Sequence, residues 1–475
     1  MSPELFRGER RRWWTLAAVS FGLFMIMLDN TVVNVALPSI QRELGVGISE
    51  LEWIVTGYAL TFASLMLIGG KLADMLGRRR IFVIGIALFT LASLWCGLAD
   101  SGSMLIAARI AQGFGAALMS PASLSIIAAT FPPRQRGTAI GVWAGVSALA
   151  LAIGPLAGGL LTDHLSWHWI FFVNIPVGAV GIGASFLLID ESRDDSLEQR
   201  LDLPGLATSA LGLFALTYGL IEANANGWSS PRIVAAFAIA GMSLGGFVLL
   251  ERHQRVPMLD LALFRSATYV GANLVVLLAA LAMFGVFFFI TLYMQNVLGY
   301  SAVEAGAAFL PMTVLIILVA PLAGRLTDRT GSRALMTGGM MLVGLQLLLF
   351  ARVDAASTFW TLLPCLLIGG LGMALTMTPA TAAAMRAVPA SKAGVGSAVL
   401  NAFRQVGGSI GIALIGAIMA AQADGRRSVA AFLDGLHVAL LVAAGIAFLG
   451  AVVAFLLVRP DGHRGEEPSP VAEAA

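Results

Sequence analysis

Long apolar stretches dominate this chain of 475 residues and limit the folds that it can adopt. A helix needs about 20 apolar residues to cross a bilayer, and we count fourteen such stretches. Lipid offers no partner to open backbone groups, so the stretches predict an all-α integral membrane protein. Only 12% of the residues are charged, whereas a soluble domain carries about 25%. The stretches lie near residues 13–37, 51–70, 81–99, 103–130, 138–162, 167–189, 203–222, 232–250, 269–296, 303–324, 335–352, 358–385, 396–421 and 436–458.

The distribution of basic residues predicts the orientation of these spans. The chain has 29 Lys and Arg residues, and with a cytoplasmic N-terminus 22 of them fall in inner segments and five in outer segments. The positive-inside rule then places both termini in the cytoplasm, as expected for a multi-pass protein of the inner membrane. Because the basic residues are spread over many short loops, they argue against binding of nucleic acid.

One charged, glycine-containing motif occurs twice, after the second apolar stretch of each half of the chain. Both copies, 70–79 and 324–333, fit Gly-x-Leu-x-Asp-x-x-Gly-x-Arg. Their matching places indicate two related halves that face the same way, the plan of many secondary transporters. Contacts of the Asp residues with Arg or with a helix N-terminus would hold the cytoplasmic side closed; the alternative is a solvated loop that only sets topology. The predicted gate residues are Gly70, Asp74, Gly77, Arg78, Arg79, Gly324, Asp328, Gly331 and Arg333.

The spans divide into two sets of six with a pair between them. We expect an N-terminal six-helix bundle over 1–190, a linker with two inserted transmembrane helices over 191–268, and a C-terminal six-helix bundle over 269–460. An even insertion keeps the second bundle in the orientation of the first. The tail over 461–475 is rich in Pro, Glu and Ala, and we expect it to be a disordered cytoplasmic segment.

Two charged residues lie inside spans of the first half. Asp29 is deep in the first span, where a lone carboxylate is costly and usually marks an ion or substrate path. It could hold a proton or a cationic substrate; the alternative is a structural carboxylate that Asn30 or Asn34 caps. Arg109, in the fourth span, stays charged and needs a carboxylate, a water-filled cavity or backbone carbonyls; the alternative is that it reaches a membrane surface. These four residues are the predicted coupling site.

The fifth span contains a cluster of helix-breaking and small residues, Gly154, Pro155, Gly158 and Gly159. Proline removes a helical hydrogen bond, and glycine lets two backbones approach closely. The cluster predicts a kinked, closely packed helix. It fits a structural role and a rocking transporter equally well.

Three later residues are candidates for a central cavity. Arg404 lies inside a span of the second half, and functional and structural roles are equally open. Phe284 and Phe288 could line an apolar pocket or face lipid. The five His residues show no metal-binding or triad spacing, and no Gly-rich loop followed by Lys-Ser/Thr indicates ATP as a driver. We therefore expect no metal, no cofactor and no enzyme.

Taken together, these motifs resemble those of the major facilitator superfamily over nearly the whole chain. The chain is most similar to the fourteen-span drug:proton antiporters of the EmrB/QacA type. The Asp74 and Asp328 motifs match the loop signature of the superfamily, and Arg109 lies in its fourth-helix signature. The remaining matching residues are Gln112-Gly113, Gly154-Pro155 with Gly158-Gly159, Leu28 to Pro38, Trp53, Thr56, Tyr58, Trp167 to Phe171, Asn174, Pro176 and Gly178.

The resemblance implies a major facilitator fold and a proton-driven exporter of small amphipathic or hydrophobic, cationic compounds, working by alternating access. It implies that Asp29 and Arg109 take part in proton coupling, that substrate enters a cavity between the halves, and that the two hairpins govern the conformational switch. We expect a monomer in lipid that the proton gradient drives without a cofactor, with any periplasmic adaptor left open. The alternatives are a proton-coupled importer, or an exporter of one specific metabolite, on the same fold.

Overall fold

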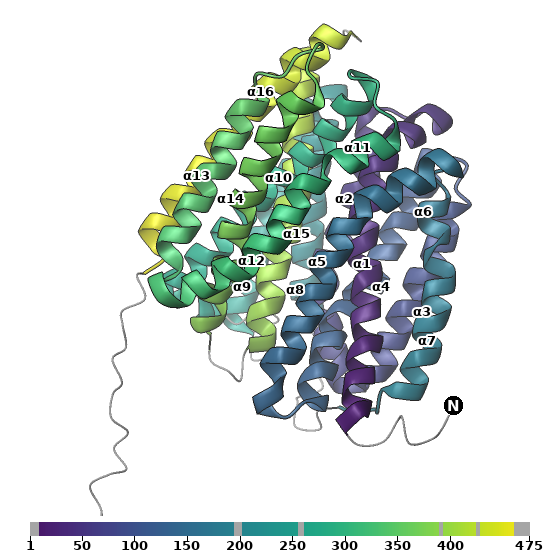
Figure 1. The fold of residues 1–475 in the computed structure, drawn as a ribbon, viewed down its shortest axis with the longest axis vertical. Helices are drawn as coiled ribbons and strands as arrows, with labels where there is room; N and C mark the ends of the chain where they lie inside the picture. The colour runs from purple at the N-terminus through teal and green to yellow at the C-terminus, as the bar shows by residue number, and fades with distance from the viewer. Residues whose placement is uncertain (1–8, 194–201, 255–260, 389–392, 424–427, 460–475) are drawn as a thin grey trace, which may run out of the picture.

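A computed structural model describes residues 9–193, 202–254, 261–388, 393–423 and 428–459 (Figure 1). Within these ranges the chain is helical, without a β-strand, so the expected all-α fold is confirmed. The predicted tail 461–475 and most of the linker before residue 202 lie outside the described residues. The helices are α1 (Glu9–Leu44), α2 (Ile48–Leu76), α3 (Arg78–Gly97), α4 (Gly102–Thr130), α5 (Pro133–His164), α6 (Trp169–Phe172), α7 (Asn174–Leu188), α8 (Leu203–Asn226), α9 (Pro231–His253), α10 (Ala267–Asn296), α11 (Ala302–Ala308), α12 (Leu310–Thr330), α13 (Ser332–Phe350), α14 (Phe359–Arg386), α15 (Ala393–Ala423) and α16 (Val429–Leu457), with a 3-10 turn at Leu261–Arg265.

The number of membrane spans can be compared with the fourteen apolar stretches. Among the described residues, twelve helices are long and apolar enough to cross a bilayer. Helix α2 adds a thirteenth if its two segments, Ile48–Met66 and Ile68–Leu76, form one span with a 50° bend. Helix α5, of 32 residues, occupies the place of the fifth predicted stretch. The total of fourteen stays a prediction.

The two ends of the described chain lie at the same end of the molecule. Helix α1 begins and α16 ends at the lower end in Figure 1, where α2 also meets α3 and α12 meets α13. We call this end, with its two motif-bearing turns, the hairpin end, and the opposite one the distal end. A shared end is what an even number of crossings produces. The assignment of the hairpin end to the cytoplasm depends on the arginine distribution and stays a prediction.

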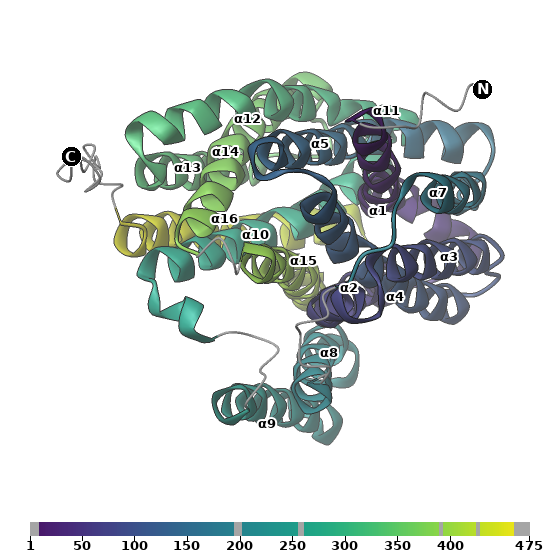
Figure 2. The ribbon, with the colours of Figure 1, turned by 90° about the horizontal axis from the view of Figure 1, so that it is seen from below.

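The helices form two groups with a smaller pair beside them. Seen from below, α1 to α4 and α7 lie on one side and α10 and α12 to α16 on the other, with α5 and α11 side by side where the two groups meet, while α8 and α9 lie together outside both groups (Figure 2). Helix α8 packs against α2 of the first group and α15 of the second. Close helix approach depends on small residues: a β-carbon at Gly115 would lie 2.5 Å from the backbone nitrogen of Phe89 on α3. The domain boundaries within this arrangement stay a prediction.

Hydrogen bonds between described residues join the two halves at the distal end. The side-chain amide of Gln295, at the end of α10, donates to the carbonyl of Val35 on α1 at 2.8 Å. The backbone N–H groups of Ala302 and Val303, in the first turn of α11, donate to the carboxylate of Asp163 on α5 at 3.3 Å and 2.8 Å. The halves are therefore held together at the distal end in this conformation.

Candidate functional site

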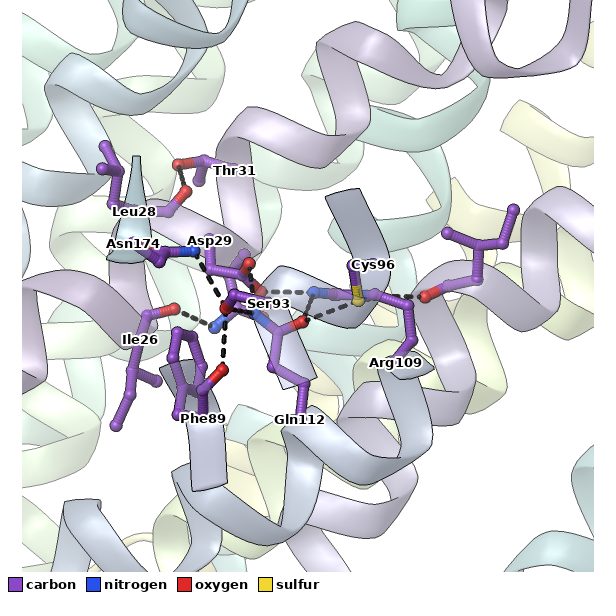
Figure 3. Close-up of polar contacts among 12 residues, drawn as sticks. Ile26, Leu28, Asp29, Thr31, Phe89, Ser93, Cys96, Arg109, Gln112 and Asn174 are labelled. Atoms are coloured by element: carbon purple, nitrogen blue, oxygen red, sulfur yellow. Dashed lines mark hydrogen bonds and ion pairs between the residues drawn. The ribbon is translucent and has the colours of Figure 1, made fainter. Parts of the chain in front are cut away.

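A buried ion pair occupies the centre of the first helical group (Figure 3). The Arg109 Nη1 atom on α4 lies 2.5 Å from the Asp29 Oδ2 atom on α1, and the two side chains are 1% and 0% exposed. The Nε atom of Arg109 donates to the carbonyl of Ile54 on α2 at 3.0 Å. Arg109 thus has both a carboxylate and a backbone carbonyl as partners, and it does not reach a membrane surface.

Polar side chains of three helices extend this pair into a network. Gln112, one turn after Arg109, donates from Nε2 to Asp29 Oδ1 at 2.9 Å and to the Ser93 hydroxyl on α3 at 2.8 Å. Its Oε1 atom accepts from Arg109 at 2.5 Å. The amide of Asn174, on α7, donates to the same Ser93 hydroxyl at 3.3 Å. Both carboxylate oxygens of Asp29 are therefore satisfied, as a buried anion requires.

The guanidinium of Arg109 also lies over aromatic rings. Its Cζ atom is 4.3 Å from the centroid of Tyr58 and 5.8 Å from that of Phe171. Cation–π contacts of a desolvated guanidinium contribute about 2 kcal/mol. Apolar residues and aromatic rings enclose the pair, so a change in the charge of either partner would be felt strongly by the other.

Asn30 and Asn34 do not cap Asp29, which was the structural alternative for this carboxylate. The amide of Asn30 donates to the carbonyl of Ile26 at 2.9 Å, and that of Asn34 donates to the carbonyl of Asn30 at 3.2 Å. Both side chains therefore bond to their own helix, one turn back. Arg109 and Gln112 bind the Asp29 carboxylate instead.

The small residues of the fifth span lie at two different contacts. Gly154 and Gly158 face α1 within the same half, where a β-carbon at Gly158 would lie 2.8 Å from the carbonyl oxygen of Val32. Gly159 faces the other half, where a β-carbon would lie 2.6 Å from the carbonyl oxygen of Ala302 on α11. The carbonyl of Pro155 meets the backbone of Gly306 on α11. The predicted close packing is present, and part of it forms the distal contact between the halves.

The first hairpin is closed by a carboxylate that the sequence did not single out. Asp74 pairs with Arg78 at 2.7 Å, one turn along the chain, rather than with a helix N-terminus. Glu191, after α7, instead accepts from the backbone N–H groups of Arg79 and Arg80 at 3.0 Å and 3.1 Å. Of the two expected kinds of contact, Asp74 makes the one with an arginine, while Glu191 folds over the first turn of α3. Gly77, which joins the helices with a φ of +114°, faces the Glu191 carboxylate.

The second hairpin has different contacts. Gly331 turns the chain with a φ of +81°, as Gly77 does in the first copy. The guanidinium of Arg333 lies 4.1 Å from the ring centroid of Phe455 on α16, and Arg386 donates to the Ser332 hydroxyl at 2.7 Å. The side chain of Asp328 lies outside the described residues. A gating role of both hairpins stays a prediction.

Removing the Glu191 carboxylate is expected to loosen the first hairpin. Glu191→Ala leaves two N–H groups of α3 without an acceptor, which costs about 1 kcal/mol. We expect a lower unfolding temperature of the purified protein and faster tryptic cleavage at Arg78, Arg79 and Arg80. Asp190→Ala is the matched control, since Asp190 makes only an exposed ion pair with Arg11, and such pairs contribute little. Equal effects of the two variants would show that Glu191 has no capping role.

The three cavity candidates of the second half are separated by the structure. Phe288 is fully buried beside Phe289, with ring centroids 4.8 Å apart, so it belongs to the core and not to a pocket wall. Phe284 is half-buried, and its ring lies 3.0 Å from where a β-carbon of Gly408 would be, one turn after Arg404. Arg404 is also half-buried, and no described residue forms a hydrogen bond or an ion pair with it.

Sequence reasoning missed several residues that the structure brings to these contacts. Ser93 gave a usable signal, because it is a polar residue inside an apolar stretch at the level of Asp29. Gln295 and Asp163 join the halves, and Glu191 closes a hairpin more than 100 residues away in the chain. Nothing local marks such residues, since their partners are brought to them only by the tertiary fold.

Two helical groups that meet at one end of a membrane protein, with an ion pair buried in one of them, form the architecture of a secondary transporter. The family model described as Major Facilitator Superfamily matches residues 19–412 and, in a second match, residues 274–474. The chain belongs to the Major Facilitator Superfamily. It is a multi-pass transporter of the cytoplasmic membrane and not an enzyme, as expected from its sequence.

Several similar proteins are named bacterial resistance or export proteins. The chain is 40% identical over 473 residues to the puromycin resistance protein pur8 of Streptomyces alboniger, covering 97% of this chain and 94% of that protein. It is 39% identical to the multidrug resistance protein Stp of Mycobacterium tuberculosis and 36% identical to the tetracenomycin C resistance and export protein of Streptomyces glaucescens, each covering 87% of this chain and 77% of the relative. The expected resemblance to drug-efflux members of the superfamily is confirmed.

Solved structures show the same fold. A bacterial homolog of the human lysosomal transporter Spinster, in an inward-facing and unoccupied conformation, superposes with a TM-score of 0.67 at 17% identity, covering 95% of this chain and 98% of that chain. A peptide transporter in complex with sulfate superposes with a TM-score of 0.68 at 16% identity, covering 93% of both chains. These likenesses concern the fold alone.

Proposed function

We propose that this protein exports small amphipathic or hydrophobic drugs across the cytoplasmic membrane by alternating access, driven by the proton gradient. The buried pair of Asp29 and Arg109 is the observation that supports proton coupling. The family of the chain and the names of its relatives support drug export. We propose that it acts as a monomer in lipid, with protons and substrate as its partners and without a cofactor.

The pair offers a physical link between a proton and a helix movement. When Asp29 takes up a proton, its attraction to Arg109 is lost, and Arg109 keeps Ile54, Gln112 and the rings of Tyr58 and Phe171 as partners. An arginine cannot lose its charge in exchange. Protonation therefore favours a rearrangement of α1 relative to α4 that gives Arg109 another partner, and deprotonation restores the pair.

The second half contributes two features to substrate binding in this proposal. Arg404 is a cation without a described partner inside a span, and such residues usually mark a ligand path. Phe284 lies beside Gly408, one turn after Arg404 on α15, and offers an aromatic surface. An amphipathic compound could place a ring on Phe284 and a polar group near Arg404. Cationic drugs remain the expected class, and acidic compounds belong in the same panel because Arg404 would favour them.

Transport by membrane vesicles of a pump-deficient bacterial host tests direction and coupling together. Inside-out vesicles are acidified by respiration, so an exporter driven by proton entry should accumulate drug in them. Collapse of the pH gradient with nigericin should release the drug. Vesicles with the Asp29→Asn variant should accumulate no more than empty-vector vesicles. Gradient-driven accumulation in right-side-out vesicles with an acidic exterior, and none in inside-out vesicles, would identify the importer instead.

A further inference from the structure

A second carboxylate is buried in this protein, at the distal end of α2. Glu52 lies one turn into the helix and is only 2% exposed. Its neighbour Glu50 is exposed and accepts a hydrogen bond from the backbone of Gly47, as an acidic residue at a helix N-terminus usually does. Burial of Glu52 is thus a property of its surroundings and not of its position near a helix end.

The surroundings of Glu52 come from three parts of the fold. Its carboxylate fits against Gly416 of α15, where a β-carbon would collide with the carboxylate oxygens. Among the described charged groups, Glu222 of α8 repels the Glu52 carboxylate. Trp53, the residue after Glu52, contacts the ring of Tyr218 on α8, with centroids 6.4 Å apart. Glu52 is therefore enclosed where the first half, the second half and the inserted pair of helices meet.

No described residue donates a hydrogen bond to the Glu52 carboxylate or pairs with it as a cation. Arg404 is the only charged residue of α15, and it lies in the opposite half of that helix from Gly416. The remaining titratable groups at the distal ends of α1, α2, α8 and the turn before α4 are Arg42, Glu43, Glu50, Asp100 and Tyr218, and Glu222 alone among the described groups acts on Glu52. An ionised carboxylate that is buried without a donor and beside a like charge is strongly disfavoured, whereas a neutral carboxylic acid is tolerated.

The contrast with Asp29 separates two kinds of buried acid. Asp29 has a guanidinium and an amide bound to its two oxygens, so it can be ionised where it is. Among the described residues Glu52 has no such partners, and its enclosure depends on α15 lying against α2. If the halves part at the distal end, Glu52 meets water and can ionise.

We propose that Glu52 is a second proton-binding site, which holds a proton while the distal end is closed and releases it when α2 and α15 part there. The proposal rests on alternating access in the proposed function. A carboxylate exposed at the open distal end takes one proton from the outer solution, becomes a neutral carboxylic acid, and can then be enclosed against Gly416. On reopening, the proton returns to the same solution. Protons outside therefore favour the closing step, independently of the pair at Asp29.

Labelling of a cysteine at the distal contact tests this proposal. Gln295 is 8% exposed in the closed conformation, so Gln295→Cys should react with a membrane-impermeant maleimide only when the distal end opens. Labelling of the purified transporter in liposomes is measured from about pH 5 to about pH 8. It is divided by labelling of Leu165→Cys, an exposed distal residue, which removes the pH dependence of the thiol reaction itself. Background is low because Cys96 and Cys365 are buried.

Expected results differ between the two acids. In the parent, normalised labelling should rise with pH, by up to about tenfold per pH unit for one proton. Glu52→Gln should label weakly at every pH, since its side chain stays neutral. Asp29→Asn should keep the rise in labelling although it loses driven efflux. Glu222→Gln removes the charge that disfavours an ionised Glu52 in the closed conformation, so it should make the rise in labelling smaller than in the parent.

Two outcomes would overturn the proposal: a Glu52→Gln protein that keeps the parental rise in labelling, or a Glu222→Gln protein whose labelling rises more with pH than that of the parent. Gly416→Ala supplies an independent variant, because its β-carbon displaces the carboxylate and should raise labelling at low pH. Failure here is distinct from failure of the proposed function. The Glu52 result concerns closure of the distal end, whereas the proposed function fails if Asp29→Asn retains full gradient-driven efflux.

Discussion

Asp29→Leu is expected to destabilise the folded transporter by about 3–5 kcal/mol and to abolish efflux. The variant leaves the Arg109 guanidinium buried, with 1% of its side chain exposed, and without its counter-ion. Arg109→Met should destabilise the folded transporter less than Asp29→Leu, because an unpaired Asp29 can take up a proton whereas an arginine cannot give one up. Thermal unfolding in detergent measures the order of the two variants, and drug efflux from cells measures their function.

The double variant Asp29→Leu/Arg109→Met separates stability from transport. Replacing a whole buried ion pair with apolar residues is often neutral or stabilising, so the unfolding temperature should return close to that of the parent. Efflux should stay lost, because no group remains that can exchange a proton. The coupling energy of the pair follows from the four proteins of this cycle. Gradient-driven efflux by the double variant would show that the pair serves folding only.

Asp29→Asn is the control for charge without loss of shape. Asparagine keeps one oxygen that can accept from Arg109, and it replaces the other acceptor and the titratable group with an NH2 donor. The variant should therefore retain more stability than Asp29→Leu and yet lose proton-driven efflux. An Asp29→Asn protein as unstable as Asp29→Leu would indicate that the charge itself, and not the hydrogen bonds at Asp29, holds α1 against α4.

The ion pair was predictable because burial leaves few choices to a charged residue. Asp29 and Arg109 both lie in apolar stretches, and each needs an opposite charge or a polar group. The sequence could not distinguish Asn30 or Asn34 from Gln112 as the partner of Asp29, since all three are polar and within a plausible distance along the helices. The structure decides in favour of Gln112, because Asn30 and Asn34 bond to their own helix.

Glu52 and Asp163 were not predictable by the same reasoning. Each lies near the end of a span, where an acidic residue is ordinarily solvated and needs no partner. Glu52 is buried only because α8 and α15 cover it, and Asp163 finds α11 only because the two halves meet at the distal end. Both features belong to the contact between segments that are distant in the chain. A periodicity or a motif within one span contains no information about that contact.

Gly159→Ala is expected to abolish efflux while leaving the protein folded. A β-carbon at this position would lie 2.6 Å from the carbonyl oxygen of Ala302 and 2.7 Å from the Cα atom of Val303, across the contact between the halves. The clash is relieved when the distal end opens, so the substitution should hold the transporter in its distally open conformation. Because the three atoms nearest to this β-carbon all belong to α11 of the other half, unfolding of the first half is expected to be unaffected.

The neighbouring glycine provides a matched control with the opposite expectation. A β-carbon at Gly158 would lie 2.8 Å from the carbonyl oxygen of Val32 and 2.9 Å from its Cα atom, on α1 of the same half. This contact persists in every conformation in which α1 and α5 remain packed together. Gly158→Ala should therefore lower the unfolding temperature and the amount of folded protein, in contrast to Gly159→Ala. The two variants add the same methyl group at neighbouring positions.

Labelling of Gln295→Cys from outside distinguishes the two effects. In the Gly159→Ala background it should react several-fold faster than in the parent at the same pH, because Gln295 is released from Val35 when the distal end opens. In the Gly158→Ala background, the folded fraction should label like the parent. If Gly159→Ala instead lowers stability as much as Gly158→Ala and leaves labelling unchanged, then this face of α5 serves folding alone. The distal contact would then not be the element that alternates.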